Sequence, residues 1–385
     1  MKLFRNILNT IKPHFEKGGK LEKMYPAYDA FETFLFVPDH TTKSGSHIRD
    51  AIDLKRTMIT VLIALMPALL FGMWNVGQLH FTAIGESFTL MSAFTFGALK
   101  MLPLIAISYG VGLSIEFAFA ISRGHSVNEG YLVTGMLIPM VMPIDVPLWM
   151  LAVSVVFAVI IGKEVFGGTG MNVLNPALVT RAFIFFAYPA QMSGDAVWIA
   201  ADTTADAMSG ATVLATATLG GANAVVDSYA WWDAFFGFVP GSMGETSTLA
   251  CLLGAAVLIG SGIGSWRIML SVAVGTFMMA STLNTIGSAT NPFFDVTPAW
   301  HFVAGGWAFG TVFMATEPVT APASIRGHYI YGFLIGVLCV LVRVVNPAYP
   351  EGMMLSILFM NLFAPLIDYF AVQANLRRRR ARYAR

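Results

Sequence analysis

The stretch TMITVLIALMPALLFGMWNVGQ, residues 57–78, contains 22 residues and no charged side chain. As a helix it would rise about 33 Å, enough to cross the roughly 30 Å hydrocarbon core of a bilayer. Nine further apolar blocks follow along the chain, at residues 101–121, 131–145, 147–162, 173–190, 247–264, 267–287, 301–316, 328–345 and 353–372. The sequence therefore predicts an all-α integral membrane protein with about ten transmembrane helices.

Composition supports this fold class. Of the 385 residues, 56% are apolar and only 12% are charged, too few charges to cover the surface of a soluble domain. The two cysteines, Cys251 and Cys339, lie far apart in apolar blocks, which is typical of small packing residues. An iron–sulfur or zinc site formed by this chain alone is therefore not expected. No signal peptide is recognisable before the first block, so that helix is expected to target the chain.

The positive charges predict the orientation of the helices. Residues 1–56 form a basic arm with ten Lys and Arg, and the tail at 375–385 contains six arginines. Four more basic residues lie in loops on the same side, namely Arg123, Lys163, Arg267 and Arg326. With 20 of the 23 Lys and Arg on one side, the positive-inside rule makes that side cytoplasmic, and both termini are expected there. The other three are Lys100, expected in an outer segment, and Arg181 and Arg343, within apolar blocks.

The long segment 191–246 then falls on the outer face. It contains no Lys or Arg, and its acids are Asp195, Asp202, Asp206, Asp227, Asp233 and Glu245. A plain connector of this length is unusual in a compact protein, so a functional role is expected. The segment separates a first five-block half, residues 57–190, from a second half, residues 247–374.

A weak internal repeat relates the two halves. Asn175-Pro176-Ala177 opens the fifth block, and Asn346-Pro347-Ala348 precedes the tenth. Each follows a proline-containing break two blocks earlier, at Met142-Pro143 and at Glu317-Pro318. Because five is an odd number, two five-helix halves would be inverted relative to each other. A chance match of three residues is the alternative.

Three acids, Glu116, Glu317 and Asp368, lie within or at the ends of apolar blocks. A carboxylate in hydrocarbon is costly and often marks an ion pathway, whereas an acid near the interface can simply reach water or cap a helix. All three lie toward the cytoplasmic ends of their blocks. Because oxygen ligands suit a hard cation, they are candidates for a cation entry site.

Two roles are open for Arg181 and Arg343. Each is expected either to pair with a helix carboxylate or backbone carbonyls, or to hold the anionic form of a redox cofactor. Phe309 and Phe313 are four residues apart and share one helical face beside Glu317. We expect both rings in the core, with a hydrophobic constriction as the alternative.

Glycines mark two further features. The stretch KEVFGGTGMN, residues 163–172, lacks the spacing of a phosphate-binding P-loop and is more typical of a flexible hairpin close to a ligand or partner. The GxxxG pairs Gly306/Gly310 and Gly332/Gly336 predict close helix packing.

The most specific pattern is DAMSGAT, residues 206–212. On composition alone it is a small-residue turn. The pattern D-x-x-[ST]-G-A-[ST] resembles the site where a flavin transferase attaches FMN to a threonine through a phosphoester. Thr212 would be the acceptor, and the other motif residues are Asp206, Ser209, Gly210 and Ala211. The start of the sixth block, after PGSMGETS at 240–247, could help to hold the phosphate with its backbone N–H groups.

Longer stretches extend the resemblance over nearly the whole chain. They are SHIRD (46–50), DLKR (53–56), VNEG (127–130), KEVFGGTG (163–170), LNPAL (174–178), RAF (181–183), FFAYPA (185–190) and RVVNPAYPEGMM (343–354). Together they resemble the family of B subunits of the bacterial sodium-translocating NADH:quinone oxidoreductases. The resemblance implies a urea-transporter-like fold of two inverted five-helix halves in the bacterial inner membrane.

The family resemblance also implies the cofactors. FMN would be bound to Thr212 on the outer face, and a second flavin, riboflavin, would be held without a covalent bond toward the cytoplasmic side, near Asn172 and Asn175. Electrons would come from an FMN on a partner subunit, pass through both flavins and reach ubiquinone, coupled to Na+ export. The partners would be the other subunits of a six-subunit complex, including an NADH/FAD/2Fe–2S subunit, with a flavin transferase for maturation and no nucleic acid.

The resemblance implies that the N-terminal arm and a Gly-Gly pair in the second helix contact quinone. In this sequence the pair reads Gly112-Leu113, so Leu113 departs from the family pattern. The acids linked to Na+ uptake would be Glu116, Glu317, where an aspartate is more usual, and Asp368. Phe309 and Phe313 would lie on the same ion path.

Two other functions are weighed against this one. The equivalent subunit of the related ferredoxin:NAD complex shares the flavin motif, but its arm should be much shorter than the 56 residues here. A passive channel or solute carrier on a similar scaffold would have no use for the threonine acceptor.

Overall fold

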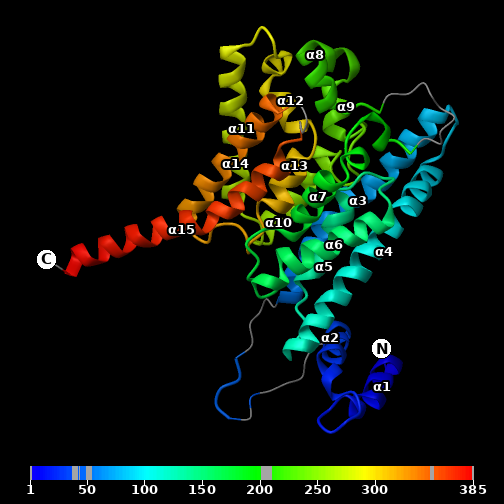
Figure 1. The fold of residues 1–385 in the computed structure, drawn as a ribbon, viewed down its shortest axis with the longest axis vertical. Helices are drawn as coiled ribbons and strands as arrows, with labels where there is room; N and C mark the ends of the chain where they lie inside the picture. The colour runs from blue at the N-terminus through cyan, green and yellow to red at the C-terminus, as the bar shows by residue number, and fades with distance from the viewer. Residues whose placement is uncertain are drawn as a thin grey trace.

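The computed structural model describes residues 2–36, 42, 44–48, 54–200, 210–346 and 351–383, and every regular element in these ranges is a helix. Figure 1 places the two N-terminal helices at one end of the molecule and α8 and α9 at the opposite end. These helices are α1 (Lys2–Ile11), α2 (Tyr25–Leu35), α8 (Val213–Ser228) and α9 (Trp231–Phe236). We refer to the two ends as the arm end and the α8–α9 end.

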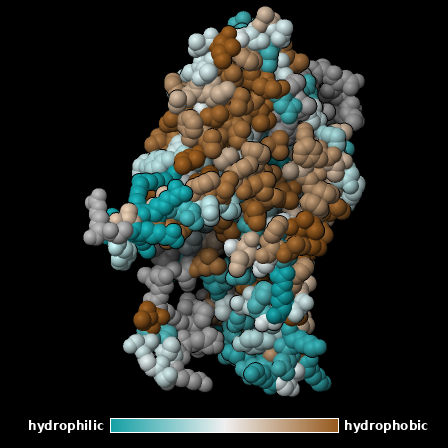
Figure 2. Space-filling model, turned by 60° about the vertical axis from the view of Figure 1, so that its left-hand side comes forward, coloured by the Kyte–Doolittle hydropathy of each residue, from teal (hydrophilic) through white to brown (hydrophobic). Residues whose placement is uncertain are grey.

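Six helices in the described ranges are long and apolar enough to cross a membrane. They are α3 (Leu54–Ile84), α4 (Leu90–Arg123), α6 (Leu148–Gly162) with the short turn after it, α11 (Trp266–Ile286), α14 (Ile325–Val345) and α15 (Met353–Tyr383). Three shorter apolar helices accompany them: α5 (Gly130–Met140), α7 (Pro176–Ala187) and α10 (Thr248–Gly260). Figure 2 shows a broad belt of hydrophobic residues, with hydrophilic residues gathered at the lower end of the view. These features fit a multi-pass membrane protein.

Nine of the ten predicted blocks coincide with one of these helices, but the eighth, 301–316, does not form a continuous helix. It is divided into α12 (Pro298–Val303), α13 (Trp307–Phe309) and one π-helical turn (Gly310–Met314). Gly305, at a φ of 60°, lies between α12 and α13 in the left-handed region that favours glycine. The prediction of one apolar helix is therefore wrong here, because hydrophobicity alone carries no signal of a backbone break.

Several other boundaries also differ from the prediction. Helix α4 begins at Leu90 rather than at 101, after a capping box formed by Thr89 and Ser92. Lys100 lies inside α4 and pairs with Asp145 at 2.7 Å, so it is part of a helix rather than of the segment before the second block, where the sequence places it. Helix α5 stops at Met140 rather than at 145. Helix α15 continues through the predicted tail as far as Tyr383.

Several helix contacts recur in the two halves of the chain, although α3 packs on α4 and the corresponding pair α10 and α11 does not show this close packing. Helix α4 packs against α5 and α6, and α6 packs against α7. In the second half, α11 packs against α12 and α14, and α14 packs against α15. The first helices of the two halves, α3 and α10, pack against each other.

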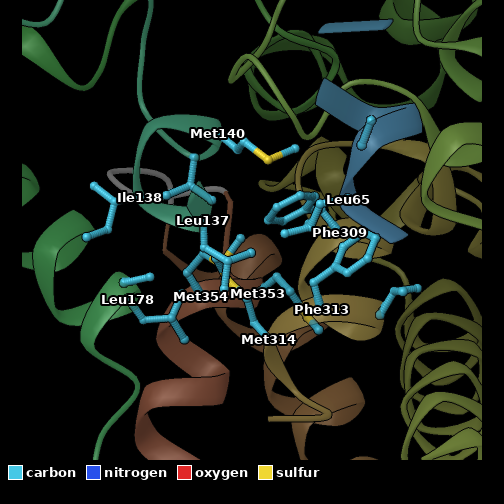
Figure 3. Close-up of a cluster of buried hydrophobic side chains, with 14 of the residues drawn as sticks. Leu65, Leu137, Ile138, Met140, Leu178, Phe309, Phe313, Met314, Met353 and Met354 are labelled. Atoms are coloured by element: carbon cyan, nitrogen blue, oxygen red, sulfur yellow. The ribbon is translucent and has the colours of Figure 1, made fainter. Parts of the chain in front are cut away.

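A central apolar cluster lies where the two halves meet (Figure 3). Its side chains come from α3, α5, α7, α13, the π-helical turn and the start of α15. The labelled members are Leu65, Leu137, Ile138, Met140, Leu178, Phe309, Phe313, Met314, Met353 and Met354. All are buried, so this cluster joins the halves by close packing.

Helices α11 and α14 approach most closely at glycines. A Cβ atom on Gly336 would lie 2.2 Å from the carbonyl oxygen of Val272. One on Gly275 would lie 2.2 Å from the carbonyl oxygen of Phe333. The absence of side chains at these positions allows the backbones to touch, as the GxxxG pattern predicts for Gly336.

Replacing Gly336 by alanine should therefore separate the two helices. We expect Gly336→Ala to lower the free energy of unfolding by about 1–3 kcal/mol, the usual cost of overpacking. The matched control is Gly110→Ala in α4, because a Cβ atom there meets no atom within 4 Å. Thermal unfolding of the two variants in detergent checks this, and equal midpoints would show that the close approach is unimportant.

Candidate functional site

A cavity of about 280 Å³ lies at the α8–α9 end, and we refer to it as the Thr212 cavity. Its lining combines α7, the start of α8, the loops 192–198 and 239–246, and residues near the start of α15. Polar groups in the lining include Arg181, Asp195, Thr212, Ser242, Glu245 and Glu351, and aromatic groups include Phe185 and Trp198. The cavity thus combines apolar walls with a few charged groups, as is typical of small-molecule sites.

Thr212 is held at the start of α8. Its hydroxyl oxygen accepts a hydrogen bond from the Ala215 N–H at 3.2 Å, which makes Thr212 the N-cap of this helix. Tyr229 donates its hydroxyl to the carbonyl of Ala211. Gly210 is buried so closely that a Cβ atom would lie 2.4 Å from the Asp195 carbonyl oxygen. Thr212 is therefore held in position at the cavity by its local contacts; the motif residues Asp206 and Ser209 lie outside the described residues.

A buried ion pair contributes to the wall of this cavity. Nη1 of Arg181 donates to both carboxylate oxygens of Glu245, at 2.8 and 3.0 Å, and each residue is only 4% exposed. Burial raises the pKa of the Glu245 carboxyl, and the Arg181 guanidinium opposes that shift. Glu245 therefore depends on Arg181 to remain ionised.

A second carboxylate approaches the first at Gly306. A Cβ atom on Gly306 would lie 2.7 Å from Oε1 of Glu245 and 3.0 Å from Oε1 of Glu351. Oε1 of Glu351 is itself buried and accepts no hydrogen bond from the described residues. Two acids therefore converge beside Gly306, with Arg181 bound to the Glu245 carboxylate and Arg343 donating to the backbone oxygen of Glu351 at 3.0 Å. A side chain at position 306 would have to displace one of the two carboxylates.

Removal of one partner should expose the cost of this buried pair. Arg181→Met leaves Glu245 buried without its cation, and we expect a loss of about 3–5 kcal/mol in the free energy of unfolding. The double variant Arg181→Met/Glu245→Gln should be more stable than Arg181→Met alone, because neither member of the pair is then charged.

Lys100→Met is the control for this cycle, because the Lys100–Asp145 pair is exposed and should be worth about 0–1 kcal/mol. Unfolding by SDS titration in mixed micelles measures all the variants. Equal losses for Arg181→Met and Lys100→Met would contradict the assignment of Arg181–Glu245 as the costly pair.

Two adjacent cavities lie at the arm end. The Glu317 cavity, of about 100 Å³, is lined by Lys163, Asn172, Asn175, Phe313 and Glu317 among others. The Glu116 cavity, of about 170 Å³, is lined by residues that include Glu116, His125 and Glu164. Thr169 lines both cavities. The structure therefore brings four of the predicted residues together in the first cavity, and Glu116 to its neighbour.

Asn175 and Glu317 are oriented by local hydrogen bonds. The side-chain oxygen of Asn175 accepts from the N–H groups of Ala177 and Leu178, at 2.9 and 3.2 Å, and caps α7. Glu317 accepts from the hydroxyl of Thr320 at 2.7 Å. These bonds keep both side chains at the cavity lining.

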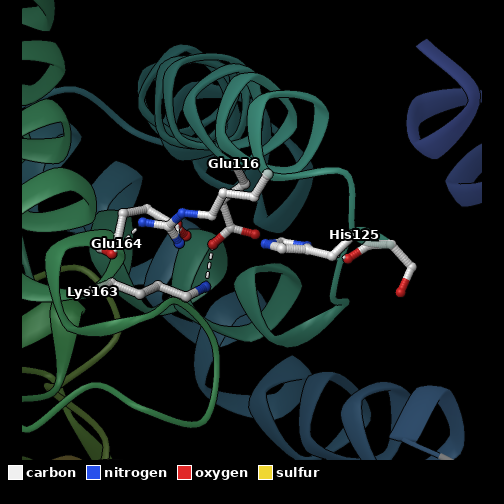
Figure 4. Close-up of polar contacts among 6 residues, drawn as sticks. Glu116, His125, Lys163 and Glu164 are labelled. Carbon is white, nitrogen blue, oxygen red and sulfur yellow. Dashed lines mark hydrogen bonds and ion pairs between the residues drawn. The ribbon is translucent and has the colours of Figure 1, made fainter. Parts of the chain in front are cut away.

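A network of ion pairs surrounds Glu116 (Figure 4). Lys163 donates to the Glu116 carboxylate, and both side chains are almost completely buried. Arg123 holds the neighbouring Glu164, with 2.8 Å to its carboxylate and 2.7 Å to its backbone oxygen. His125 lies on the other side of the Glu116 carboxylate in this view.

Gly112 lies one helical turn before Glu116. A Cβ atom on Gly112 would lie 1.8 Å from the hydroxyl oxygen of Tyr131, so the tyrosine ring requires glycine here. Asp368 is not among the described residues that line the arm-end cavities. Its carboxylate accepts from the N–H groups of Ala323 and Ser324, at 2.6 and 3.0 Å, just before α14 begins.

The two ends are separated by the central apolar cluster. Val303 and Gly305 line the Thr212 cavity, whereas Phe313 and Glu317 line the Glu317 cavity. Phe309 lies between them at 0% exposure, with its ring 5.1 Å from that of Phe313. The two rings therefore belong to the packed core.

The sequence does not predict Lys163, Glu245 or Glu351 as members of these sites. Lys163 counts there as a loop residue and Glu245 as one of several acids in the outer segment. The available signal is their position, because each stands at the edge of an apolar block, where a charge is readily buried by its neighbours.

Known proteins resemble this chain over nearly its whole length. The NQR2, RnfD, RnfE family matches residues 41–377. A protein of Chromohalobacter salexigens, named as the B subunit of a Na(+)-translocating NADH-quinone reductase, is 51% identical, and the match covers 99% of this chain and 97% of the relative. Proteins of the same name from Stutzerimonas stutzeri and Pseudomonas aeruginosa are 51% and 50% identical, each match covering 98% of this chain and 99% of the relative.

Proposed function

Because this chain belongs to the NQR2, RnfD, RnfE family, we propose that it is the membrane subunit of a redox-driven sodium pump that transfers electrons to ubiquinone and exports Na+. The curated relatives support the assignment, because they are named as B subunits of the sodium-translocating reductase and match this chain over nearly their full length. The positive-inside distribution supports a cytoplasmic arm end, cytoplasmic termini and an outer α8–α9 end in the bacterial inner membrane. NADH would be oxidised on another subunit of the complex.

The helix contacts that recur in both halves support two inverted five-helix halves. In each half the second helix packs on the fourth and the fourth on the fifth. Because each half has an odd number of apolar segments, their orientations in the membrane would be opposite. The short helix α7 and the divided eighth segment would then count as the fifth and eighth spans of a ten-span, urea-transporter-like layout.

Thr212 would carry FMN through a phosphoester in the Thr212 cavity. The residues present fit this group, because the N-terminus of α8 offers backbone N–H groups and the positive end of a helix dipole to the phosphate. This helix start is nearer than the start of α10, which the sequence suggests for the same purpose. The rings of Phe185 and Trp198 line the same cavity and could cover an isoalloxazine ring.

FMN would supply one-electron and two-electron redox chemistry at this site. The protein contributes position and charge. Thr212 fixes the point of attachment, and the Arg181–Glu245 pair places a guanidinium in the cavity wall, where it would stabilise negative charge. Gly210 and Gly306 leave space that a side chain would fill.

Riboflavin does not fit the Glu317 cavity. The cavity measures about 100 Å³, well below the roughly 300–1,000 Å³ of small-molecule pockets, whereas the Thr212 cavity, at about 280 Å³, is close to the lower end of that range. Asn172 and Asn175 line it, but no electron step is assigned to riboflavin at this position. At about 30 Å³ for each water, the space suits a cation with a few waters instead.

The arm-end cavities would then receive Na+ from the cytoplasm. Glu116 and Glu317 would supply oxygen ligands in adjacent cavities, and the packed rings of Phe309 and Phe313 would block direct passage toward the Thr212 cavity. Asp368 would act indirectly, through the start of α14. An effect of Gly112 on quinone reduction would act through the position of Tyr131.

Loss of the Thr212 hydroxyl should abolish flavin attachment. We expect Thr212→Ala to give no fluorescent band under ultraviolet light after denaturing electrophoresis, and no quinone reduction in the assembled complex. Thr218→Ala is the matched control, because Thr218 lines the same cavity and should leave attachment unchanged. A fluorescent Thr212→Ala chain would refute the proposed attachment site.

A further inference from the structure

The Glu116–Lys163 ion pair separates the two arm-end cavities. Glu116 comes from α4 and lines the Glu116 cavity, whereas Lys163 follows α6 and lines the Glu317 cavity. Their side chains are only 5% and 3% exposed. Because Thr169 lines both cavities, they are neighbours, and the ion pair belongs to the wall between them.

Acidic side chains outnumber basic ones in the lining of the two cavities beside this wall. Three carboxylates, those of Glu116, Glu164 and Glu317, line the two cavities. Arg123 is engaged by Glu164 through its carboxylate and its backbone oxygen. Among the described residues lining the two cavities, the basic side chains are Lys163 and His125. The Lys163 side chain is therefore the basic group paired with Glu116, and it lies in the same cavity lining as Glu317.

Lys163 is positioned by an aromatic surface rather than by a second acid. Its ammonium lies 5.5 Å from the centre of the Tyr131 ring. Tyr131 is fixed in turn, because its hydroxyl donates to the Ser108 carbonyl at 2.9 Å and its ring occupies the space beside Gly112. A lysine has four flexible carbons, so its charge can move while the aromatic surface stays in place.

We propose that the Lys163 ammonium is a tethered cation, which pairs with the Glu116 carboxylate until the transported cation replaces it. This inference rests on the proposed function, in which Na+ enters at these acids. A buried carboxylate without a cation is costly, so Glu116 always retains one of the two. When Na+ binds Glu116, the ammonium withdraws toward Glu317 and the wall between the cavities opens. No covalent bond changes in this step.

A resident competitor weakens the apparent affinity for the ion, because Na+ binds only the fraction of sites that the ammonium has left. Lys163→Met removes the competitor, and the Na+ concentration for half-maximal quinone reduction should fall roughly three- to tenfold. Lys163→Arg should raise it, since the planar guanidinium can bind the carboxylate through two hydrogen bonds and leaves less readily. Lys100→Met, which alters the ion pair with Asp145, should leave it unchanged.

The test uses the assembled complex, with NaCl as the probe. The Na+-dependent rise in the thermal unfolding midpoint is recorded beside turnover, because a purely structural lysine would alter the midpoint without altering its Na+ dependence. Opposite shifts for Lys163→Met and Lys163→Arg support the proposal. An unchanged Na+ dependence in both variants overturns it, and if Lys163→Met does not assemble, an unchanged Lys163→Arg is sufficient to do so.

Glu116→Gln distinguishes this failure from failure of the proposed function. If Glu116→Gln raises the half-maximal Na+ concentration while both Lys163 variants leave it unchanged, the ion route stands and the tethered cation is refuted. If all three variants behave as the parent complex does, Na+ does not bind at Glu116. Both the proposed ion route through Glu116 and the tethered cation are then refuted.

Discussion

The cost of an unpaired charge in an apolar interior governs both ends of this molecule. Arg181 and Glu245 neutralise each other at the α8–α9 end, and Lys163 and Glu116 do so at the arm end. Each pair is almost completely buried, and each contributes to the lining of a cavity. Such a pair is a weak source of stability, because desolvation offsets most of the attraction. Under the proposed function, its value would lie in holding charge beside a cofactor at one end and an ion at the other.

The central apolar cluster gives the two charged ends separate roles. Helix α7 connects the two cavities, because Pro176 lines the Glu317 cavity and Arg181 lines the Thr212 cavity. The rings of Phe309 and Phe313 lie on a second segment that reaches from one cavity to the other. That segment is irregular, with Gly305 in a left-handed conformation and a π-helical turn at Gly310–Met314. Turns of this kind are frequent at functional sites, and a break at this position can move more easily than a regular helix. Under the proposed function, a change of charge in the Thr212 cavity at the α8–α9 end would be coupled through this segment to ion movement at the arm end.

The sequence predicts the helical blocks well, because an apolar run of spanning length has few other uses. The cap at Asn175 comes from the structure, although the Asn-Pro pair is a local signal that indicates it. The sequence does not predict the division of the eighth block, where glycines interrupt an otherwise apolar run. It offers a carboxylate as one partner for Arg181 but does not identify Glu245, and it does not predict the Glu116–Lys163 pair. The partners lie 64 residues apart in Arg181–Glu245 and 47 apart in Glu116–Lys163. Such contacts depend on how the helices assemble, and no local pattern encodes them.

If the Thr212 cavity is the flavin site, the most direct measurement is mass spectrometry of this chain, purified with its flavin transferase present. The intact mass should exceed that of the sequence by one FMN phosphoester, and fragmentation should locate the addition on Thr212. An unmodified chain, or an addition confined to another residue such as Thr218, would contradict the assignment.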